Sequence, residues 1–186
     1  MATYGEILGL RLKTGKYNAP NFGIIPRAII WGGFGIWIAS MMVIFKMGVP
    51  AFLDNKMGLD GLQVAFNASN FSGYKLLGSF AISVFMNTTF AIVFMTLHMI
   101  TDFHIGRYNG KLKALLKPIK FMEIIGALNW NMQWNFVFKK TIPFFWIPAH
   151  TITFILPDEY QVLFAASLSI ALGLILSIAS LASKKN

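Results

Sequence analysis

Five polar side chains stand inside long stretches of this sequence that carry no charge, and they are its best candidates for chemistry. They are Asn87, Thr89, His98, His150 and Thr153. Amide, hydroxyl and imidazole groups within a membrane usually face the interior of a helix bundle, where they bond to one another or line a water path. Lining a path, they would replace part of a solute's hydration shell. We therefore predict that these five residues line a small-solute path, with simple interhelical hydrogen bonding as the alternative.

The histidines also suggest two sharper kinds of site. His98 and Asp102 are one helical turn apart and His104 is near, a set that could hold a metal ion. Such a pair is more often a local hydrogen bond. A haem held between His98 and His150 would need both at one depth. With 1.5 Å per helical residue, they lie about 6 Å and about 15 Å from the expected inner boundaries. We expect no metal and no cofactor.

The uncharged stretches also lack the groups that an enzyme within the membrane would use. No Ser-His-Asp order, glycine-rich phosphate loop or carboxylate pair occurs within them. An active site needs a nucleophile, a base or a charge-stabilising group in mutual reach. We therefore expect no catalytic residues and no enzymatic activity.

Four uncharged runs must position the polar side chains. They contain 18, 26, 17 and 24 residues, against the about 20 that carry a helix across a hydrocarbon core of ~30 Å. Only a fully hydrogen-bonded backbone is stable there. The sequence therefore predicts an all-α integral membrane protein with a single domain over residues 1–186 and four transmembrane helices. The expected spans are 28–49, 75–101, 141–157 and 160–183.

The net charge of +9 comes from residues at the ends of these runs. With four spans, 13 of the 16 basic residues fall on one side and three in the first loop. The positive-inside rule then places both termini on the cytoplasmic-equivalent side of a bacterial inner membrane or an organellar membrane. We expect anionic lipid headgroups as partners of these residues, and no nucleic acid.

Residues 111–138 separate the second and third runs and are predicted to lie at the membrane surface. Four apolar residues, Leu112, Leu115, Leu116 and Ile119, recur at helical spacing opposite three lysines. This pattern predicts a basic amphipathic interfacial helix that ends near Pro118; a solvated charged loop is the alternative. Two tryptophans four residues apart are typical of a headgroup-level anchor. The expected lipid-interface residues are Lys113, Lys117, Lys120, Trp130 and Trp134.

Small residues recur at helical spacing in the first and last runs. Because lipid is as apolar as leucine, helices in a membrane associate largely through small side chains that let two backbones approach. The partner helix could belong to the same chain or to a second copy. The expected helix-packing residues are Gly32, Gly35, Ala39, Ser169, Gly173 and Ser177.

The third run contains a recognisable motif. It reads Phe145-Trp146-Ile147-Pro148-Ala149-His150, followed by Phe154, Pro157 and Tyr160. Over about the last 50 residues it resembles the C-terminal signature of the Mpv family of peroxisomal and mitochondrial inner-membrane proteins. Thr153 stands where that family has an asparagine, Gln161 where it has an arginine, and Asn87 lies in the region of its Asp-Gln pair. The resemblance implies a channel-like conduit for small molecules, without naming the cargo.

Two functions follow from these patterns. We predict a channel-like conduit for small solutes; the alternative is a non-catalytic accessory subunit of a larger membrane complex or a homo-oligomer. A conduit requires its polar residues to point inward together. An accessory subunit would bury them in pairs and keep its small-residue faces outward.

Overall fold

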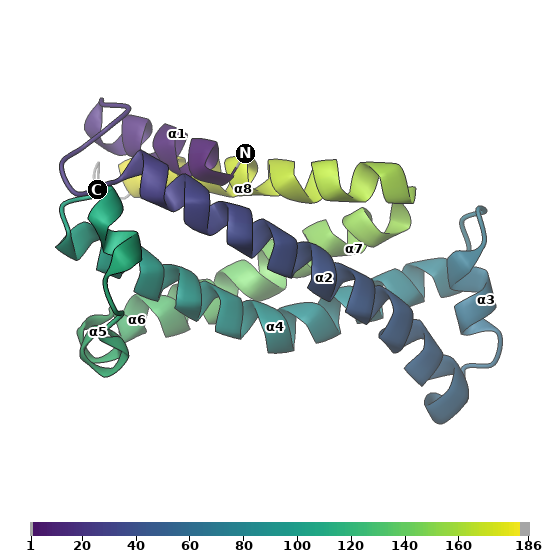
Figure 1. Ribbon diagram of the computed structural model, residues 1–186. Helices are drawn as coiled ribbons and strands as arrows, with labels where there is room; N and C mark the ends of the chain where they lie inside the picture. Colours follow the sequence, from purple (N-terminus) through teal and green to yellow (C-terminus); the bar gives the residue numbers. More distant parts are fainter. Residues whose placement is uncertain (1, 183–186) are drawn as a thin grey trace. The chain divides into compact units, whose positions relative to one another are not determined.

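The computed structural model describes the backbone of residues 2–182, and the side chains of that range other than Lys13, Ser169 and 172–182. All regular elements in the described range are helices, which confirms the all-α prediction (Figure 1). They are α1 (Ala2–Thr14), α2 (Ile24–Met57), α3 (Leu62–Asn67), α4 (Gly73–Arg107), the 3₁₀ helix η1 (Leu112–Leu116), α5 (Phe121–Ala127), α6 (Trp130–Met132), the π-helix η2 (Gln133–Trp146), α7 (Ile147–Ile155) and α8 (Asp158–Ala182).

Within the described residues, α2 and α4 are the two helices long and apolar enough to cross a membrane. Their most apolar 18-residue windows have mean hydropathies of 2.0 and 1.9. Only 6% and 28% of these windows are buried by the rest of the chain. Such apolar, uncovered surface is suited to lipid rather than to water. Both helices extend beyond the predicted spans of 28–49 and 75–101, and the four-span topology stays a prediction.

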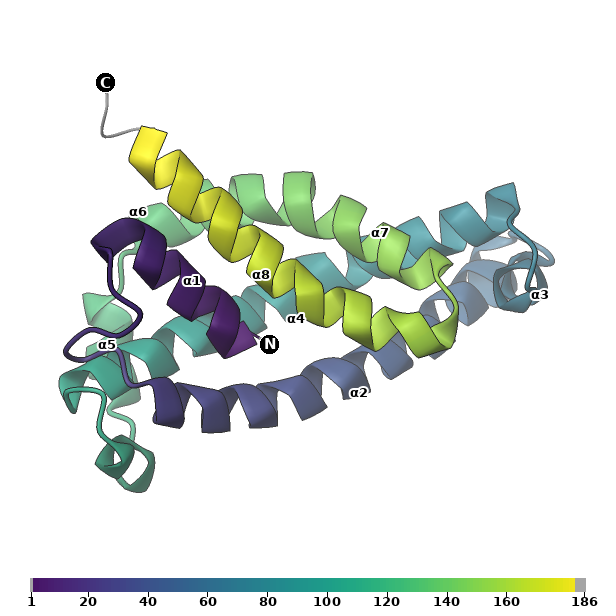
Figure 2. The same cartoon turned by 90° about the horizontal axis from the view of Figure 1, so that it is seen from above.

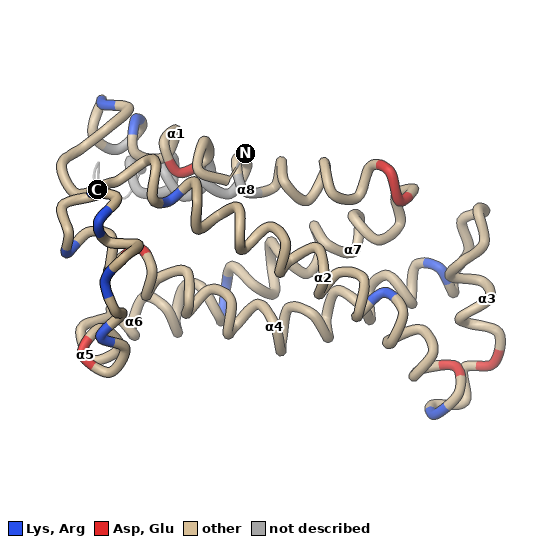
Figure 3. The backbone as a smooth tube through the Cα atoms, viewed as in Figure 1, with Lys and Arg blue, Asp and Glu red and all other residues tan. Residues whose placement is uncertain are grey.

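The chain folds into two compact units, and each long helix contributes to both. Unit 1 comprises residues 1–35, 97–128 and 165–186, and unit 2 comprises residues 36–96 and 129–164. Unit 1 holds 11 of the 16 basic residues but three of the seven acidic ones. Figure 3 shows many of these basic residues at the α1–α2 and α4–α5 connections. In unit 1, positive charge therefore gathers where the chain turns between helices.

The core of unit 1 joins α4 to α5. Ile100 on α4 and Ile124 on α5 are almost fully buried against Leu128. The two turns that precede α2 and follow α4 meet at Gly23 and Gly110, both with positive φ. A Cβ atom on Gly23 would lie 2.7 Å from the Cα atom of Gly110. Only glycine fits this approach, because any side chain would overlap the facing backbone.

Aromatic contacts join α2 to α4 in unit 2. Trp37 meets Phe90 edge-on at a centroid distance of 4.8 Å, and Phe52 meets Phe85 at 6.2 Å. Residue numbers rise along α2 as they fall along α4, so the two helices are antiparallel here. On the other side of α4, Figure 2 shows α7 running alongside it. The α4–α7 contact is the one that brings polar groups together.

The surface segment after α4 is not one amphipathic helix. It forms η1 over five residues, and Lys117 then adopts an extended conformation before Pro118. A residue before proline is driven out of the helical region, so the helix ends and α5 begins only at Phe121. The predicted lipid-interface side chains, Lys113, Lys117, Lys120, Trp130 and Trp134, are all exposed.

The helix that leads into the predicted third span has an unusual geometry. In η2, the Thr141 hydroxyl donates to the carbonyl of Phe136, five residues back, and the Ile147 amide donates to Ile142 in the same way. Pro143 lies inside this stretch and lacks an N–H. A π-helix is rare and often marks functional sites. It carries the chain continuously from α6 into α7, so the helix begins well before the predicted boundary at residue 141.

Candidate functional site

A buried polar seam joins α4 to α7 in unit 2. Ser79, Ser83 and Asn87 follow one another at intervals of four on α4, and none has exposed surface. This spacing places all three on one face of the helix. Ser83 donates a hydrogen bond of 2.7 Å from its hydroxyl to the carbonyl oxygen of Ile147, where η2 passes into α7. The seam therefore bonds α4 to the chain at the end of the π-helix.

Asn87 and His150, two of the predicted path-lining residues, are in contact within this seam. The Asn87 amide nitrogen donates to the carbonyl oxygen of Ser83 at 2.8 Å and lies 3.0 Å from Nδ1 of His150. The same Nδ1 atom lies 3.3 Å from the Asn87 carbonyl oxygen, Oδ1, so the histidine tautomer decides which atom donates across this contact. Nε2 makes no hydrogen bond to any residue whose side chain is described. The pair thus joins α4 to α7 through two side chains and leaves Nε2 of His150 without a bond to the described residues.

Other polar atoms near the seam lack partners. Trp146 stacks on His150 with a centroid distance of 5.1 Å and an angle of 22° between the rings. Its Nε1 atom, the Ser79 hydroxyl and both polar atoms of the Gln133 amide are buried, and none has a hydrogen-bond partner among the described residues. Buried polar groups normally find a protein partner or a water molecule. Unit 2 therefore contains polar atoms that its own described side chains do not satisfy.

The predicted threonines bond to their own helices. Thr89, which is exposed, donates to the carbonyl of Phe85 at 2.6 Å. Thr153, which is fully buried, donates to the carbonyl of Ala149 at 3.0 Å. A hydroxyl satisfied four residues back in its own helix offers less to a passing solute. The structure thus places Asn87 and His150 together, and leaves the two threonine hydroxyls on their own helix backbones.

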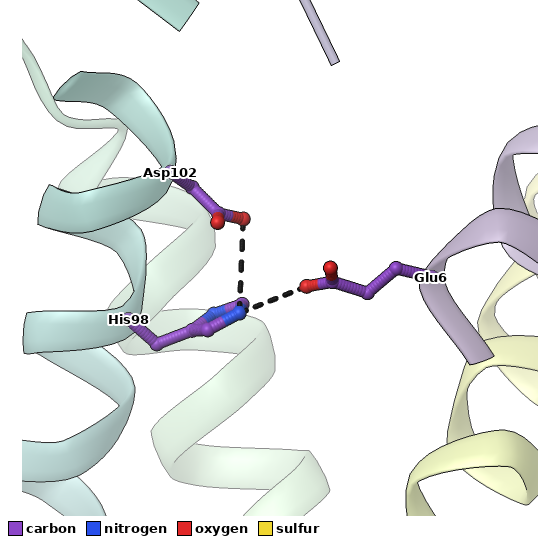
Figure 4. A group of neighbouring side chains, drawn as sticks. All are labelled: Glu6, His98 and Asp102. Atoms are coloured by element: carbon purple, nitrogen blue, oxygen red, sulfur yellow. Dashed lines mark hydrogen bonds and ion pairs between the residues drawn. The ribbon is translucent and has the colours of Figure 1, made fainter. Parts of the chain in front are cut away.

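His98 lies in unit 1, in an ionic cluster with Asp102 and Glu6 (Figure 4). Its Nε2 atom lies 2.9 Å from Oε1 of Glu6 on α1 and 3.7 Å from Oδ2 of Asp102 on α4. The shorter contact is a hydrogen bond, which the imidazole donates to the carboxylate. His98 is thus the centre of a cluster that the sequence analysis did not assemble.

Arg27 completes this cluster from the start of α2. One guanidinium nitrogen, NH1, lies 2.6 Å from Oδ2 of Asp102 and 3.2 Å from Oε2 of Glu6. Its Nε atom donates to the carbonyl oxygen of Phe22 at 2.7 Å. Burial by itself raises the pKa of Glu6, but the hydrogen bond from His98 and the charges of His98 and Arg27 outweigh it and lower that pKa below its ordinary value. Glu6 is therefore held as a carboxylate.

The third residue of the metal set that the sequence analysis considered and did not favour is directed elsewhere. His104 is buried and donates from Nε2 to the carbonyl oxygen of Ala114 in η1 at 2.9 Å. Glu6 instead joins His98 and Asp102. The sequence contains a partial signal for the rest of the cluster, because Arg27 and Asp102 stand at the predicted inner ends of the first two predicted spans. Nothing in the sequence pairs Glu6 with His98.

The small residues of α2 are open. A Cβ atom built on Gly32 or on Gly35 would meet no atom of the described chain within 4 Å, and both glycines are exposed. Ala39 is half-buried. The other predicted packing residues, Ser169, Gly173 and Ser177, have side chains outside the described residues. Within the described chain, the first of the two small-residue stripes therefore faces outward.

Two surface hollows lie away from the predicted path. One, of about 430 Å³, belongs to unit 2 and is lined by α2, α3 and the first turn of α8, including Lys46, Gln63, Asn67 and Asp158. The other, of about 710 Å³, belongs to unit 1 and lies between the turn before α2 and the turn after α4. Neither is lined by any of the five predicted path residues.

Comparison with protein families, with curated proteins and with solved structures finds no match for this chain. The resemblance to the Mpv family therefore stays a prediction from the sequence motif. Any functional assignment must come from the chain's own geometry.

Proposed function

We propose that this chain is an integral membrane protein with four crossings that serves as a non-catalytic accessory subunit of a larger membrane complex, and that α2 docks onto a transmembrane helix of that complex. The observation that carries the proposal is the open face of α2. Gly32 and Gly35 would permit another backbone to approach closely, and no described part of the chain covers them. In lipid, such a face is a helix-binding surface, because close packing is the main attraction between helices there.

The polar residues of unit 2 support the same reading. Asn87 bonds to His150, Ser83 bonds to the backbone at Ile147, and Thr89 and Thr153 bond to their own helices. These are pairwise bonds of the kind that hold helices together in lipid. They resemble the interior of an adhesive bundle more than the lining of a passage.

An ion pair in unit 2 supports the four crossings. Lys46, in the second half of α2, pairs with Asp158 in the first turn of α8. Gln63 and Asn67 of the first loop line the same hollow as Asp158. The α7–α8 turn therefore lies with the α2–α4 connection, as expected when a third span has returned the chain to the outer side.

The size of the native assembly tests this proposal. Membranes from cells that express the chain would be solubilised in mild detergent, and the particle containing it sized by native electrophoresis. We expect a particle larger than one 20.8 kDa chain with its micelle, and a smaller particle for Gly32→Leu and for Gly35→Leu. Gly48→Leu is the matched control, since Gly48 is equally open but lies nearly opposite on the helix.

Two results would contradict the docking proposal. One is a wild-type chain that migrates as a monomer under all mild conditions. The other is an assembly that tolerates leucine at positions 32 and 35 as well as at position 48. Far-UV circular dichroism of each purified variant would verify that the helices have formed.

A solute conduit is the second candidate, and the unsatisfied polar atoms favour it. The Ser79 hydroxyl and Trp146 Nε1 are buried without a partner among the described residues, and the Trp146 ring stacks on His150. A row of water molecules or a polar solute in the α4–α7 seam would supply hydrogen-bond partners for these atoms. Wild-type protein in liposomes that releases small solutes, and releases less after His150→Leu, would favour the conduit. Inserted protein that releases none would favour the accessory subunit.

A further inference from the structure

We propose that Glu6, His98 and Asp102 form a binding site for a divalent transition-metal ion, with the ion taking the place of the proton that joins His98 to Glu6. The three residues come from α1 and α4 of unit 1, and their side chains converge (Figure 4). The site is separate from the α2 face and from the seam of unit 2. Its failure would leave the proposed function untouched.

The distances fit a small metal ion. One ligand atom from each residue lies within 4.8 Å of the other two. His98 Nε2 is 2.9 Å from Glu6 Oε1 and 3.7 Å from Asp102 Oδ2. Metal–ligand bonds of about 2.0 to 2.2 Å in a tetrahedron place neighbouring ligand atoms about 3.3 to 3.6 Å apart. Small side-chain rotations, with no backbone change, would bring the three atoms to that spacing.

The types of ligand define the class of metal. One imidazole and two carboxylates are borderline donors that suit Zn²⁺ and its first-row neighbours. Calcium and magnesium prefer oxygen alone. Three protein ligands leave a fourth position for water, as in an open zinc site. Zinc is therefore the appropriate probe, and calcium the appropriate negative comparison.

Arg27 is the obvious rival for the two carboxylates, and its geometry leaves room for an ion. It contacts Glu6 through Oε2, whereas Oε1 faces His98. It contacts Asp102 through Oδ2, an oxygen with a second lone pair. Its guanidinium also lies over the Phe22 ring at 4.5 Å and donates to the Phe22 carbonyl, which holds it to one side. Arg27 would thus orient both carboxylates as an outer-shell donor.

Charge also permits the ion. With a neutral imidazole, two carboxylates facing one guanidinium leave one negative charge within a cluster whose side chains are 12 to 27% exposed, and a proton on His98 balances that charge. A partly buried net charge is costly without a further partner. The Trp31 ring lies over His98 at a centroid distance of 4.8 Å and limits movement of the imidazole. The site is therefore held in position, and a bound ion would supply the positive charge that the proton on His98 otherwise supplies.

Zinc binding to the purified protein tests the proposal. Tag-free protein in detergent, stripped with a chelator, would be titrated with ZnCl₂ in a calorimeter, and bound zinc counted by elemental analysis. We expect one ion per chain, no binding of calcium, and affinity reduced at least about tenfold by Glu6→Gln and by His98→Gln. Glu123→Gln is the matched control, because it breaks the exposed Glu123–Arg107 pair in the same unit and should leave zinc binding unchanged.

Other outcomes overturn the proposal. Wild-type protein that retains no zinc, or variants that bind zinc as well as wild type, would show that the cluster is an ion-pair network alone. If a variant fails to fold, Co²⁺ bound to the wild-type protein gives a second measurement. Visible Co²⁺ bands that zinc displaces stoichiometrically would support a nitrogen-and-oxygen site at this cluster, and their absence would refute it.

Discussion

His98 donates a hydrogen bond from Nε2 to Oε1 of Glu6 across a separation of 92 residues. This bond ties α1, a 13-residue helix with little amphipathic character, to the C-terminal third of α4. Arg27 at the start of α2 contacts the same carboxylate through its other oxygen. One glutamate therefore connects the N-terminal helix to both of the long apolar helices within unit 1.

Glu6→Gln should lower the stability of unit 1 in a pH-dependent way. The pKa of Glu6 is lowered in the folded protein, so its ionised form stabilises the fold above the ordinary glutamate pKa. This contribution is lost as the pH falls through the lower, folded value. At neutral pH, we expect the free energy of unfolding of the variant to be about 1.5 to 3 kcal/mol below that of the wild type, which is the contribution typical of a hydrogen bond to a charged group. Thermal unfolding in detergent from pH 7 to pH 3.5 measures the difference.

The difference in the free energy of unfolding between wild type and Glu6→Gln should become smaller towards acid pH. Glu123→Gln provides the comparison, since that carboxylate is exposed and its Arg107 partner lies on the surface; we expect little change in its case. If this difference in the free energy of unfolding is constant over the whole pH range, the glutamine acts through packing and not through loss of charge.

Sequence reasoning identified the helical class and singled out Asn87 and His150 as polar residues of two predicted spans, because both follow from hydropathy and from the cost of polar groups in lipid; it did not predict their contact. It did not identify Ser79 and Ser83, although their spacing from Asn87 is four in each case. Serine is common in membrane helices, so its presence alone carries little information. The burial of a serine depends on which helix faces it, and periodicity alone does not reveal this.

The ionic cluster and the π-helix could not be obtained from local patterns. Glu6 reaches His98 only because the turn before α2 folds back, and that turn depends on the approach of Gly23 to Gly110. Such long-range contacts are set by tertiary structure and leave no periodic trace. The stretch from Gln133 to Trp146 forms a π-helix, whereas spacings in a sequence are interpreted on the assumption of 3.6 residues per turn. With bonds to the fifth residue back, that assumption fails.

Gly23→Ala should destabilise unit 1 strongly. The added Cβ atom would lie 2.7 Å from the Cα atom of Gly110 and 2.7 Å from a methyl carbon of Ile105, at a residue with φ of +70°. Left-handed strain and overpacking together should cost at least about 2 kcal/mol. Gly15→Ala is a close control, because Gly15 has a φ of +76° and no atom of the described chain within 4 Å of an added Cβ. Chemical denaturation followed by tryptophan fluorescence gives both values. Equal costs for the two variants would mean that the Gly23–Gly110 approach is not tight in solution.

Asn87 and His150 should be energetically coupled. Removing either partner leaves the other's polar atoms buried, whereas removing both leaves no unpaired group at that contact. A double-mutant cycle with Asn87→Ala and His150→Ala should give a coupling of about 0.6 to 1.7 kcal/mol, the range found for hydrogen bonds between membrane helices. Thr89→Ala with His150→Ala should give none, because the Thr89 hydroxyl bonds to Phe85 on its own helix. The free energy of unfolding would be measured in mixed micelles with a denaturing detergent for the wild type, the two single variants and the double variant. Purely additive effects for the Asn87 pair would show that their contact contributes nothing to the α4–α7 association.

Single cysteines at positions 60, 111 and 158 should divide between the two faces of the membrane, with 111 on one side and both others on the opposite side. The chain contains no cysteine, so each introduced thiol reports on one position. Lys111 lies in the basic segment that the positive-inside rule keeps inside. Asp158 pairs with Lys46 and lines a hollow with Gln63 and Asn67 of α3. Asp60 lies two residues before α3, in the same connection between α2 and α4. An impermeant maleimide applied to sealed, oriented vesicles, before and after their permeabilisation, gives the side of each thiol.

Labelling of positions 111 and 158 from the same face would mean that the chain does not cross between α5 and α8. The segment of η2 and α7 would then not cross the membrane, and the four-crossing topology would be wrong.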